Sequence, residues 1–166
     1  DSKKQECFTH YDALHRPDWQ TVKASTKTMM IGKTVYGAAA DKKDNLNGQV
    51  KEQYDTAGII RNQEADFKGN MLISSRELVT NFQDLPDWSA NPTPHTTGEI
   101  FESESAFDAL NRPIELTAPQ LPGKPKSKIR YGYNEVGLLD TVSAKVHSNN
   151  FKTHVKGIQH DAKGQR

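Results

Sequence analysis

The sequence predicts an all-β protein in which successive antiparallel β-hairpins form a curved, open sheet. Three observations support this class. One turn pattern recurs six times in 166 residues, segments of alternating apolar and polar residues flank it, and the composition is polar. The apolar share is 34% and the mean hydropathy is −0.81. Even with the eleven glycines added, the apolar share stays below the ~45–50% usual for a compact domain. A thin sheet therefore fits better than a dense core.

The repeat is clearest in "YDALHRP" at residues 11–17 and "FDALNRP" at residues 107–113. Four further segments share the frame: "YDTAGI" at 54–59, "ADFKGN" at 65–70, "YNEVGL" at 133–138 and "HDAKGQR" at 160–166. The first position is aromatic or ring-bearing in five copies and comprises Tyr11, Tyr54, Ala65, Phe107, Tyr133 and His160. The second position is Asp12, Asp55, Asp66, Asp108, Asn134 and Asp161. The fifth is His15, Gly58, Gly69, Asn111, Gly137 and Gly164.

These columns predict hairpin turns. Asp or Asn at the first residue of a type I turn accepts a hydrogen bond from a nearby backbone amide. Gly, Asn and His are enriched at positive φ, which the residue after the turn needs to form a G1 bulge in a three-residue hairpin loop. We therefore expect positive φ at His15 and Asn111. The ring at the first position should end its strand and cover cross-strand neighbours in a similar place in each copy; Ala65 predicts one hairpin that packs differently.

The segments between the repeats predict the remaining elements. "NLNGQV" at residues 45–50 contains Asn-Gly, the strongest signal for a two-residue hairpin. "LISSRELVTNF" at 72–82 is ambiguous, because its apolar spacing also fits a helix. Residues 81–99 contain three prolines and predict the longest loop. Period-two alternation predicts strands in "RPIELTAP" at 112–119, "KIRYGY" at 128–133 and "TVSAKVHS" at 141–148.

Several blocks resemble a known family in order as well as in content. These blocks are "DALNRPIELTAP" at 108–119, "YGYNEVGLLDTV" at 131–142, "DAKGQR" at 161–166, and "TVYG", "NLNGQV", "EQYDTAGII" and "ADFKGNMLISSREL" between residues 34 and 78. Together with the Tyr-Asp-x-x-Gly frame they resemble the Rhs or YD-repeat proteins. The order of the blocks is most similar to the B component of bacterial Tc insecticidal toxin complexes and to relatives with a SpvB-like N-terminal part. The resemblance covers nearly all of residues 1–166.

The resemblance implies a segment of a β-shell that encloses a toxic C-terminal polypeptide and assists its delivery. It further implies a secreted or cell-surface protein whose partners are neighbouring repeats, of the same or a partner toxin-complex chain, and the enclosed polypeptide. The family's aspartyl autoproteolysis belongs to a different segment, and no block here matches it, so no catalytic residue is expected. A terminal strand without a neighbour should leave an open sheet edge that allows self-association, or else a disordered chain end. The alternative is a carbohydrate- or receptor-recognition surface with exposed Trp19, Trp88 and tyrosines.

None of the other motifs favours an enzyme, a cofactor site or a metal site. "IGKT" at residues 31–34 lacks the first glycine of a phosphate loop, since that position is Lys27. His147, His154 and His160 do not have metal-ligand spacing. Glu102 and Glu104 could hold a cation or act as acid and base, but a solvated face is the simpler interpretation. The lone Cys7 predicts a buried or incidental thiol.

Charge is unevenly distributed along the chain. Residues 1–119 contain 13 Lys and Arg against 18 Asp and Glu, and residues 120–166 contain 9 against 3. This dipole is too weak to predict nucleic-acid binding, and no segment approaches the ~18 apolar residues needed for direct membrane insertion. Alternate residues Lys124, Lys126, Lys128 and Arg130 could bind an anionic partner. A charged loop and edge strand that discourage aggregation are the preferred interpretation.

Overall fold

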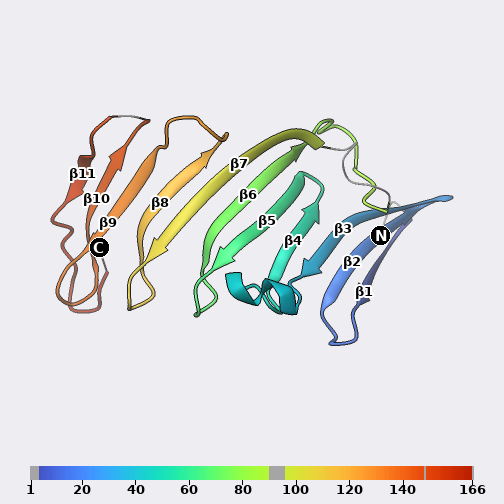
Figure 1. Ribbon diagram of the computed structural model, residues 1–166, viewed down its shortest axis with the longest axis horizontal. Coiled ribbons are helices and arrows are strands. Elements are labelled where there is room, and N and C mark those ends of the chain that lie inside the picture. The colour runs from blue at the N-terminus through green and yellow to red at the C-terminus, as the bar shows by residue number, and fades with distance from the viewer. Residues whose placement is uncertain (1–3, 90–95, 148, 166) are drawn as a thin grey trace. The chain divides into compact units, whose positions relative to one another are not determined.

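The computed structural model describes residues 4–89, 96–147 and 149–165, which contain eleven β-strands and one short 3-10 helix, η1 (Figure 1). The strands are hydrogen-bonded in chain order, from β1 to β11, in one open sheet. The predicted class of successive antiparallel hairpins is therefore confirmed. Two compact units, Asp1–Phe101 and Glu102–Arg166, divide the chain.

The first unit holds β1 (Gln5–Tyr11), β2 (Pro17–Ala24), β3 (Lys27–Tyr36), η1 (Ala39–Asp44), β4 (Val50–Asp55), β5 (Gly58–Ala65) and β6 (Met71–Val79). Strand β7 (Thr96–Phe107) begins in this unit and ends in the second. The second unit continues with β8 (Pro113–Gln120), β9 (Lys128–Tyr133), β10 (Leu139–Lys145) and β11 (Lys152–Lys156). Strand β9 coincides with the predicted "KIRYGY", because alternation and flanking turns both mark its ends.

Large buried side chains are concentrated in the first unit. The buried apolar residues of the described chain are Val22, Leu46, Tyr54, Ile59, Ala65 and Trp88. The rings of Tyr54 and Trp88 meet edge to face, with centroids 5.3 Å apart. Among the described residues of the second unit, Thr117 alone is classed as buried. The polar composition is thus expressed as a small core in one unit and a core-poor sheet in the other.

Trp88 joins two strands where their own pairing stops. Strands β3 and β4 pair from Tyr36 opposite Val50 to Lys33 opposite Tyr54. Beyond that point the Trp88 amide donates to the Met30 carbonyl at 2.8 Å, and its indole Nε1 donates to the Asp55 carbonyl at 3.0 Å. The connection after β6 therefore takes over hydrogen bonds that a continuing β4 would have made.

Three sequence expectations are corrected. The segment "NLNGQV" is no two-residue hairpin: η1 precedes it, and residues 46–49 form a turn with φ of 77° at Gly48. A two-residue type I′ hairpin also needs positive φ at Asn47, and Asn47 is not among the described residues with positive φ. The ambiguous 72–82 segment forms most of strand β6, not a helix. The loop predicted at 81–99 ends earlier, since β7 begins at Thr96; residues 90–95 lie outside the described residues.

Candidate functional site: the repeated turns

Five of the six repeat segments form the same hairpin turn. In each, the backbone carbonyl of the Asp or Asn accepts a hydrogen bond from the amide three residues later. The backbone amide of the same residue donates to the carbonyl four residues later. These turns begin at Asp12, Asp66, Asp108, Asn134 and Asp161. The bonding is that of a type I turn followed by a G1 bulge. Position five has positive φ throughout, including 59° at His15 and 67° at Asn111, as predicted.

The aspartate side chain completes each turn. Asp12 Oδ1 accepts the amides of Leu14 at 2.8 Å and Arg16 at 3.0 Å. Asp108 Oδ1 accepts the amides of Leu110 and Arg112, each at 2.9 Å. The amide hydrogen bond from the residue four positions on is the largest cause that holds the pKa of both carboxyl groups below its usual value. These carboxylates already accept hydrogen bonds from backbone amides of their own turns.

The copy at Asp55 differs because its hairpin is shorter. Asp55 pairs with Gly58, which leaves a loop of two residues. Gly58 has φ of 144°, and a Cβ there would lie 1.9 Å from the Glu77 carbonyl oxygen. The three-residue loop predicted for this copy is therefore wrong, and its glycine is required by the close approach of β6. Arg76 of β6 contacts both Asp55 carboxylate oxygens, at 2.7 and 3.0 Å.

The rings at position one do not share one environment. Tyr11 is 53% exposed, whereas Tyr54 is 9% exposed and belongs to the core. Burial is the largest cause that raises the pKa of Tyr54 to about 12, followed by its hydrogen bond to Glu52. Ala65 is buried, yet its turn has the common backbone hydrogen bonds. The turn is set by the Asp and the fifth residue rather than by the ring.

The two most similar repeats, "YDALHRP" and "FDALNRP", contain a feature that was not predicted from the sequence. Arg112 binds Asp108 Oδ2 through Nε and Nη2, both at 2.7 Å, and its guanidinium lies 4.3 Å from the Tyr133 ring centroid. The Tyr133 hydroxyl donates to the Pro113 carbonyl at 2.8 Å. We call Asp108, Arg112, Pro113 and Tyr133 an arginine clamp. It ties a turn to a strand that is not part of the same hairpin.

The first repeat builds an equivalent clamp in the first unit. Arg16 binds Asp12, and its guanidinium lies 3.9 Å from the Tyr36 ring centroid. The Tyr36 hydroxyl donates to the Pro17 carbonyl at 3.0 Å. The sequence signal was the shared Arg-Pro at the end of both repeats, followed by a tyrosine 19 or 20 residues after each proline. The two repeated segments therefore specify a turn together with the arginine and proline that contact a later tyrosine.

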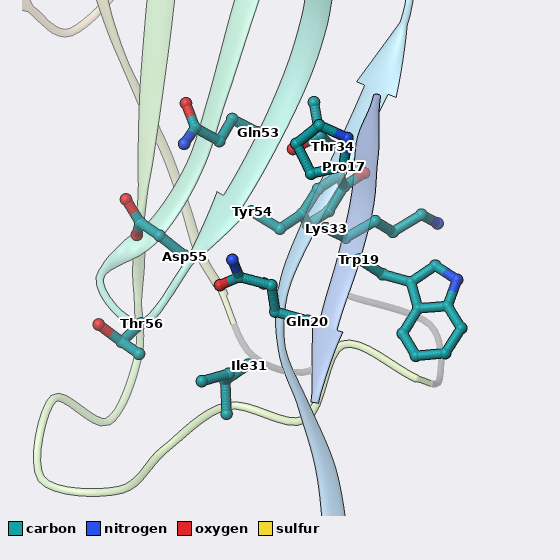
Figure 2. A pocket seen from close by; sticks show the side chains of 11 residues that line it. Pro17, Trp19, Gln20, Ile31, Lys33, Thr34, Gln53, Tyr54, Asp55 and Thr56 are labelled. Carbon is teal, nitrogen blue, oxygen red and sulfur yellow. The ribbon is translucent and has the colours of Figure 1, made fainter. Parts of the chain in front are cut away.

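The aromatic side chains proposed as recognition platforms differ in their exposure. Trp88 and Tyr54 are buried, and the Trp19 ring stacks on His10 at 4.5 Å. A groove of about 350 Å³ lies at β2, β3 and β4 and is lined by Trp19 and Gln20 among others. Figure 2 shows these two side chains on opposite sides of β2.

The charged candidates are largely paired across strands. Lys126 contacts Glu104, while Lys128 and Arg130 both contact Glu115. Strand β9 pairs with β8 and β10, so the prediction that its basic residues protect an edge strand is wrong. Glu102 lies opposite Gln120 in the β7–β8 pairing. No group of three or more potential metal ligands occurs within the described residues, and Cys7 is exposed.

The chain is similar in sequence and in fold to proteins of toxin complexes. No family model matches the chain. The chain is 27% identical over 141 residues to toxin subunit YenC2 of Yersinia entomophaga, and the match covers 80% of this chain and 14% of that protein. The predicted resemblance to toxin-complex YD-repeat proteins is confirmed by this relative together with the structures below.

Solved structures share the fold over nearly the whole chain. A crystal structure of TcdB2–TccC3–Cdc42 matches with a TM-score of 0.87, 20% identity, and coverage of 98% of this chain and 8% of that one. The Tc holotoxin pore of Photorhabdus luminescens matches with a TM-score of 0.83, 20% identity, and coverage of 97% and 8%. The chain therefore spans a small part of the proteins that it resembles. No segment among its described helices could span a membrane.

Proposed function

We propose that residues 1–166 are a non-catalytic segment of a YD-repeat shell that encloses a toxic C-terminal polypeptide and assists its delivery from a secreted or cell-surface toxin complex. The observation that carries this proposal is the fold of toxin-complex chains, matched over 98% of this chain at a TM-score of 0.87. Neighbouring repeats, of this chain or of a partner toxin-complex chain, are its partners, together with the enclosed polypeptide.

The chemistry of the repeated turns supports a structural rather than a catalytic role. A general acid or base must present its carboxylate to a substrate. The Asp12 and Asp108 carboxylates instead accept two backbone amides and an arginine each. The turns beginning at Asp66 and Asp161 use their Oδ1 atoms in the same way. Their residues are most economically explained as the ends of hairpins.

Protection from protease in the whole protein that contains this segment tests the proposal. The C-terminal polypeptide should survive proteinase K under native conditions and be digested once the protein is unfolded in urea. The double variant Arg16→Ala and Arg112→Ala removes both clamps and should shorten its survival, whereas Lys124→Ala should not. Native digestion of that polypeptide as rapid as in urea would refute enclosure.

A glycan array distinguishes the alternative function, carbohydrate recognition, from the shell role. If the segment is a carbohydrate-recognition surface, it should bind at least one glycan above background, and Trp19→Ala should abolish the signal. The shell proposal expects no such signal.

A further inference from the structure

The Asn47–Gly48 pair lies in the connection between η1 and β4 (Figure 1) and has no part in the proposed shell role. It is the one Asn-Gly pair in the sequence, and Asn47 is exposed. Asparagine is among the thermolabile residues of proteins. A following glycine, which has no side chain, leaves the asparagine open to attack by the next backbone nitrogen. The pair is therefore a candidate for covalent modification.

The reaction available to this pair is deamidation. The Gly48 backbone nitrogen, once it has lost its proton to hydroxide, attacks the Asn47 side-chain carbon Cγ and closes a five-membered succinimide ring. The Cγ–Nδ2 bond breaks, and the nitrogen leaves as ammonia with a proton taken from water. Water then opens the ring at one of its two carbonyl carbons, which leaves either aspartate or isoaspartate at position 47.

Two features of the folded connection oppose this reaction. The Gly48 amide donates to the Gly37 carbonyl at 2.9 Å, so the attacking nitrogen holds its proton in a hydrogen bond. The Gln49 amide donates to the Leu46 carbonyl at 2.9 Å. With positive φ at Gly48 but not at Asn47, this bond defines a type II turn. Asn47 then has ψ of about 120°, which turns the Gly48 nitrogen away from the Asn47 side chain, so the reaction requires the turn to open.

Close packing of the backbone holds this turn in place. Asn47 and Gly37 form a backbone bridge, and the Gly37 amide donates to the Gln49 carbonyl at 2.9 Å. A Cβ at Gly37 would lie 2.0 Å from the carbonyl oxygen of Leu46, which is itself 2% exposed. Opening the turn therefore breaks two backbone hydrogen bonds beside a buried leucine.

We propose that Asn47 is a deamidation site whose rate is set by opening of the Gly37–Asn47 bridge. In the folded chain the reaction proceeds from the fraction of molecules in which this bridge is open. Isoaspartate lengthens the main chain by a methylene group, so the bridge cannot re-form in its original register. The modification is thus a permanent record of opening. This site is independent of the shell proposal, and either can fail without the other.

Mass spectrometry of the tryptic peptide 44–51 measures the reaction, because fragmentation distinguishes positions 45 and 47. At mildly alkaline pH, Asn47 of the folded chain should be modified at least about tenfold more slowly than Asn47 of the chain unfolded in urea. Asn45 is an internal control, because the leucine that follows it hinders attack. Asn47→Gln should abolish the signal, since the longer side chain does not close a five-membered ring.

Exchange of the Gly48 amide hydrogen with deuterium reports the same opening, because it also requires release from the Gly37 carbonyl. Gly37→Ala should accelerate exchange and modification by the same factor. Gly32→Ala is the matched control and should change neither, since no atom lies closer than 3.6 Å to the place that its Cβ would take.

Urea concentrations below the unfolding midpoint provide a test that needs no substitution. They should raise the exchange rate of the Gly48 amide and the modification rate of Asn47 together, and this result stands even if Gly37→Ala does not fold. Equal modification rates in the folded and unfolded chains would overturn the proposal. Faster exchange in Gly37→Ala without faster modification, or an unmodified Asn47 in the unfolded chain, would do the same.

Discussion

Gly137 occupies the fifth position of its turn with φ of 85°, and a Cβ there would lie 3.1 Å from Arg112 Nη1. Arg112 cannot easily move, because Asp108 and the Tyr133 ring hold it on both sides. Gly123 has a similar φ of 76°, but no atom lies within 4 Å of the place that a Cβ would take there. We expect Gly123→Ala to lower the unfolding free energy by about 1 kcal/mol through backbone strain and Gly137→Ala to lower it further. Urea denaturation measures both.

The same pair of residues supplies the control for this prediction. In an Arg112→Ala background, Gly137→Ala should cost no more than Gly123→Ala, because only the backbone term is left. An equal cost of Gly137→Ala in the presence and absence of Arg112 would show that the contact has no energetic role. The double-mutant comparison isolates the contact as long as both single variants stay folded.

Arg112 also tests the clamp itself. Its two hydrogen bonds to Asp108 and its stacking on Tyr133 require a planar, forked cation. Arg112→Ala should lower the unfolding free energy by about 1–2 kcal/mol, and Arg112→Lys should recover less than half of that loss. Lys124→Ala, which removes a charge without a clamp, should be nearly neutral in the same denaturation experiment. Full recovery by lysine would reduce the clamp to a simple charge pair.

At the scale of elements, the hairpins were predictable and their connections were not. The turn at Asp108 is determined by residues within five positions, so its hydrogen bonds and the positive φ of Asn111 follow from local sequence. The arginine clamp joins Pro113 to Tyr133, and Trp88 reaches Met30 and Asp55 across more than thirty residues. Such contacts depend on which strands become neighbours. Period and turn chemistry alone do not specify them.

Among the contacts between elements, those of Trp88 should contribute most to the unfolding free energy. It is 3% exposed and hydrogen-bonds both strands at the point where β3 and β4 separate. Trp88→Ala should lower the unfolding free energy by about 3–5 kcal/mol. Trp88→Phe keeps most of the apolar volume but leaves the Asp55 carbonyl without the indole donor, at a cost of about 1–3 kcal/mol. Phe82→Ala, at an 85% exposed position, should be nearly neutral by chemical denaturation.

The ion pairs of Glu104 in β7 and Glu115 in β8 predict a pH dependence. Hydrogen bonding by Lys126 holds the pKa of Glu104 below its usual value, and Lys128, followed by Arg130, does the same for Glu115. A carboxyl group with a lowered folded-state pKa stabilises the fold above its unfolded-state pKa, and this stabilisation is lost as the pH falls through the folded-state value. The urea concentration at the unfolding midpoint should therefore decrease as the pH is lowered from about 5 to about 3. Glu115→Gln should flatten this fall, and an unchanged profile would contradict it.

At the scale of the whole molecule, the two units bury unequal amounts of apolar surface. The six buried apolar residues belong to the first unit, whereas Thr117 is the one residue of the second classed as buried among the described residues. Backbone hydrogen bonds protect amides from exchange only as well as the surrounding packing resists local opening. The second unit must therefore depend on turn geometry, its arginine clamp and ion pairs, as the low apolar share of the sequence suggested.

Hydrogen–deuterium exchange should follow this difference. Amides of β4 and β5, which carry Tyr54 and Ile59, should exchange more slowly than those of β9 and β10, although all four strands have a partner on each side. The arginine clamp makes the comparison sharper: Arg112→Ala should accelerate exchange in β8 and β9 while leaving β4 and β5 unchanged. Uniform protection across the four strands, or acceleration in β4 on loss of Arg112, would mean that the two units unfold as one cooperative structure in which the core of the first stabilises the second.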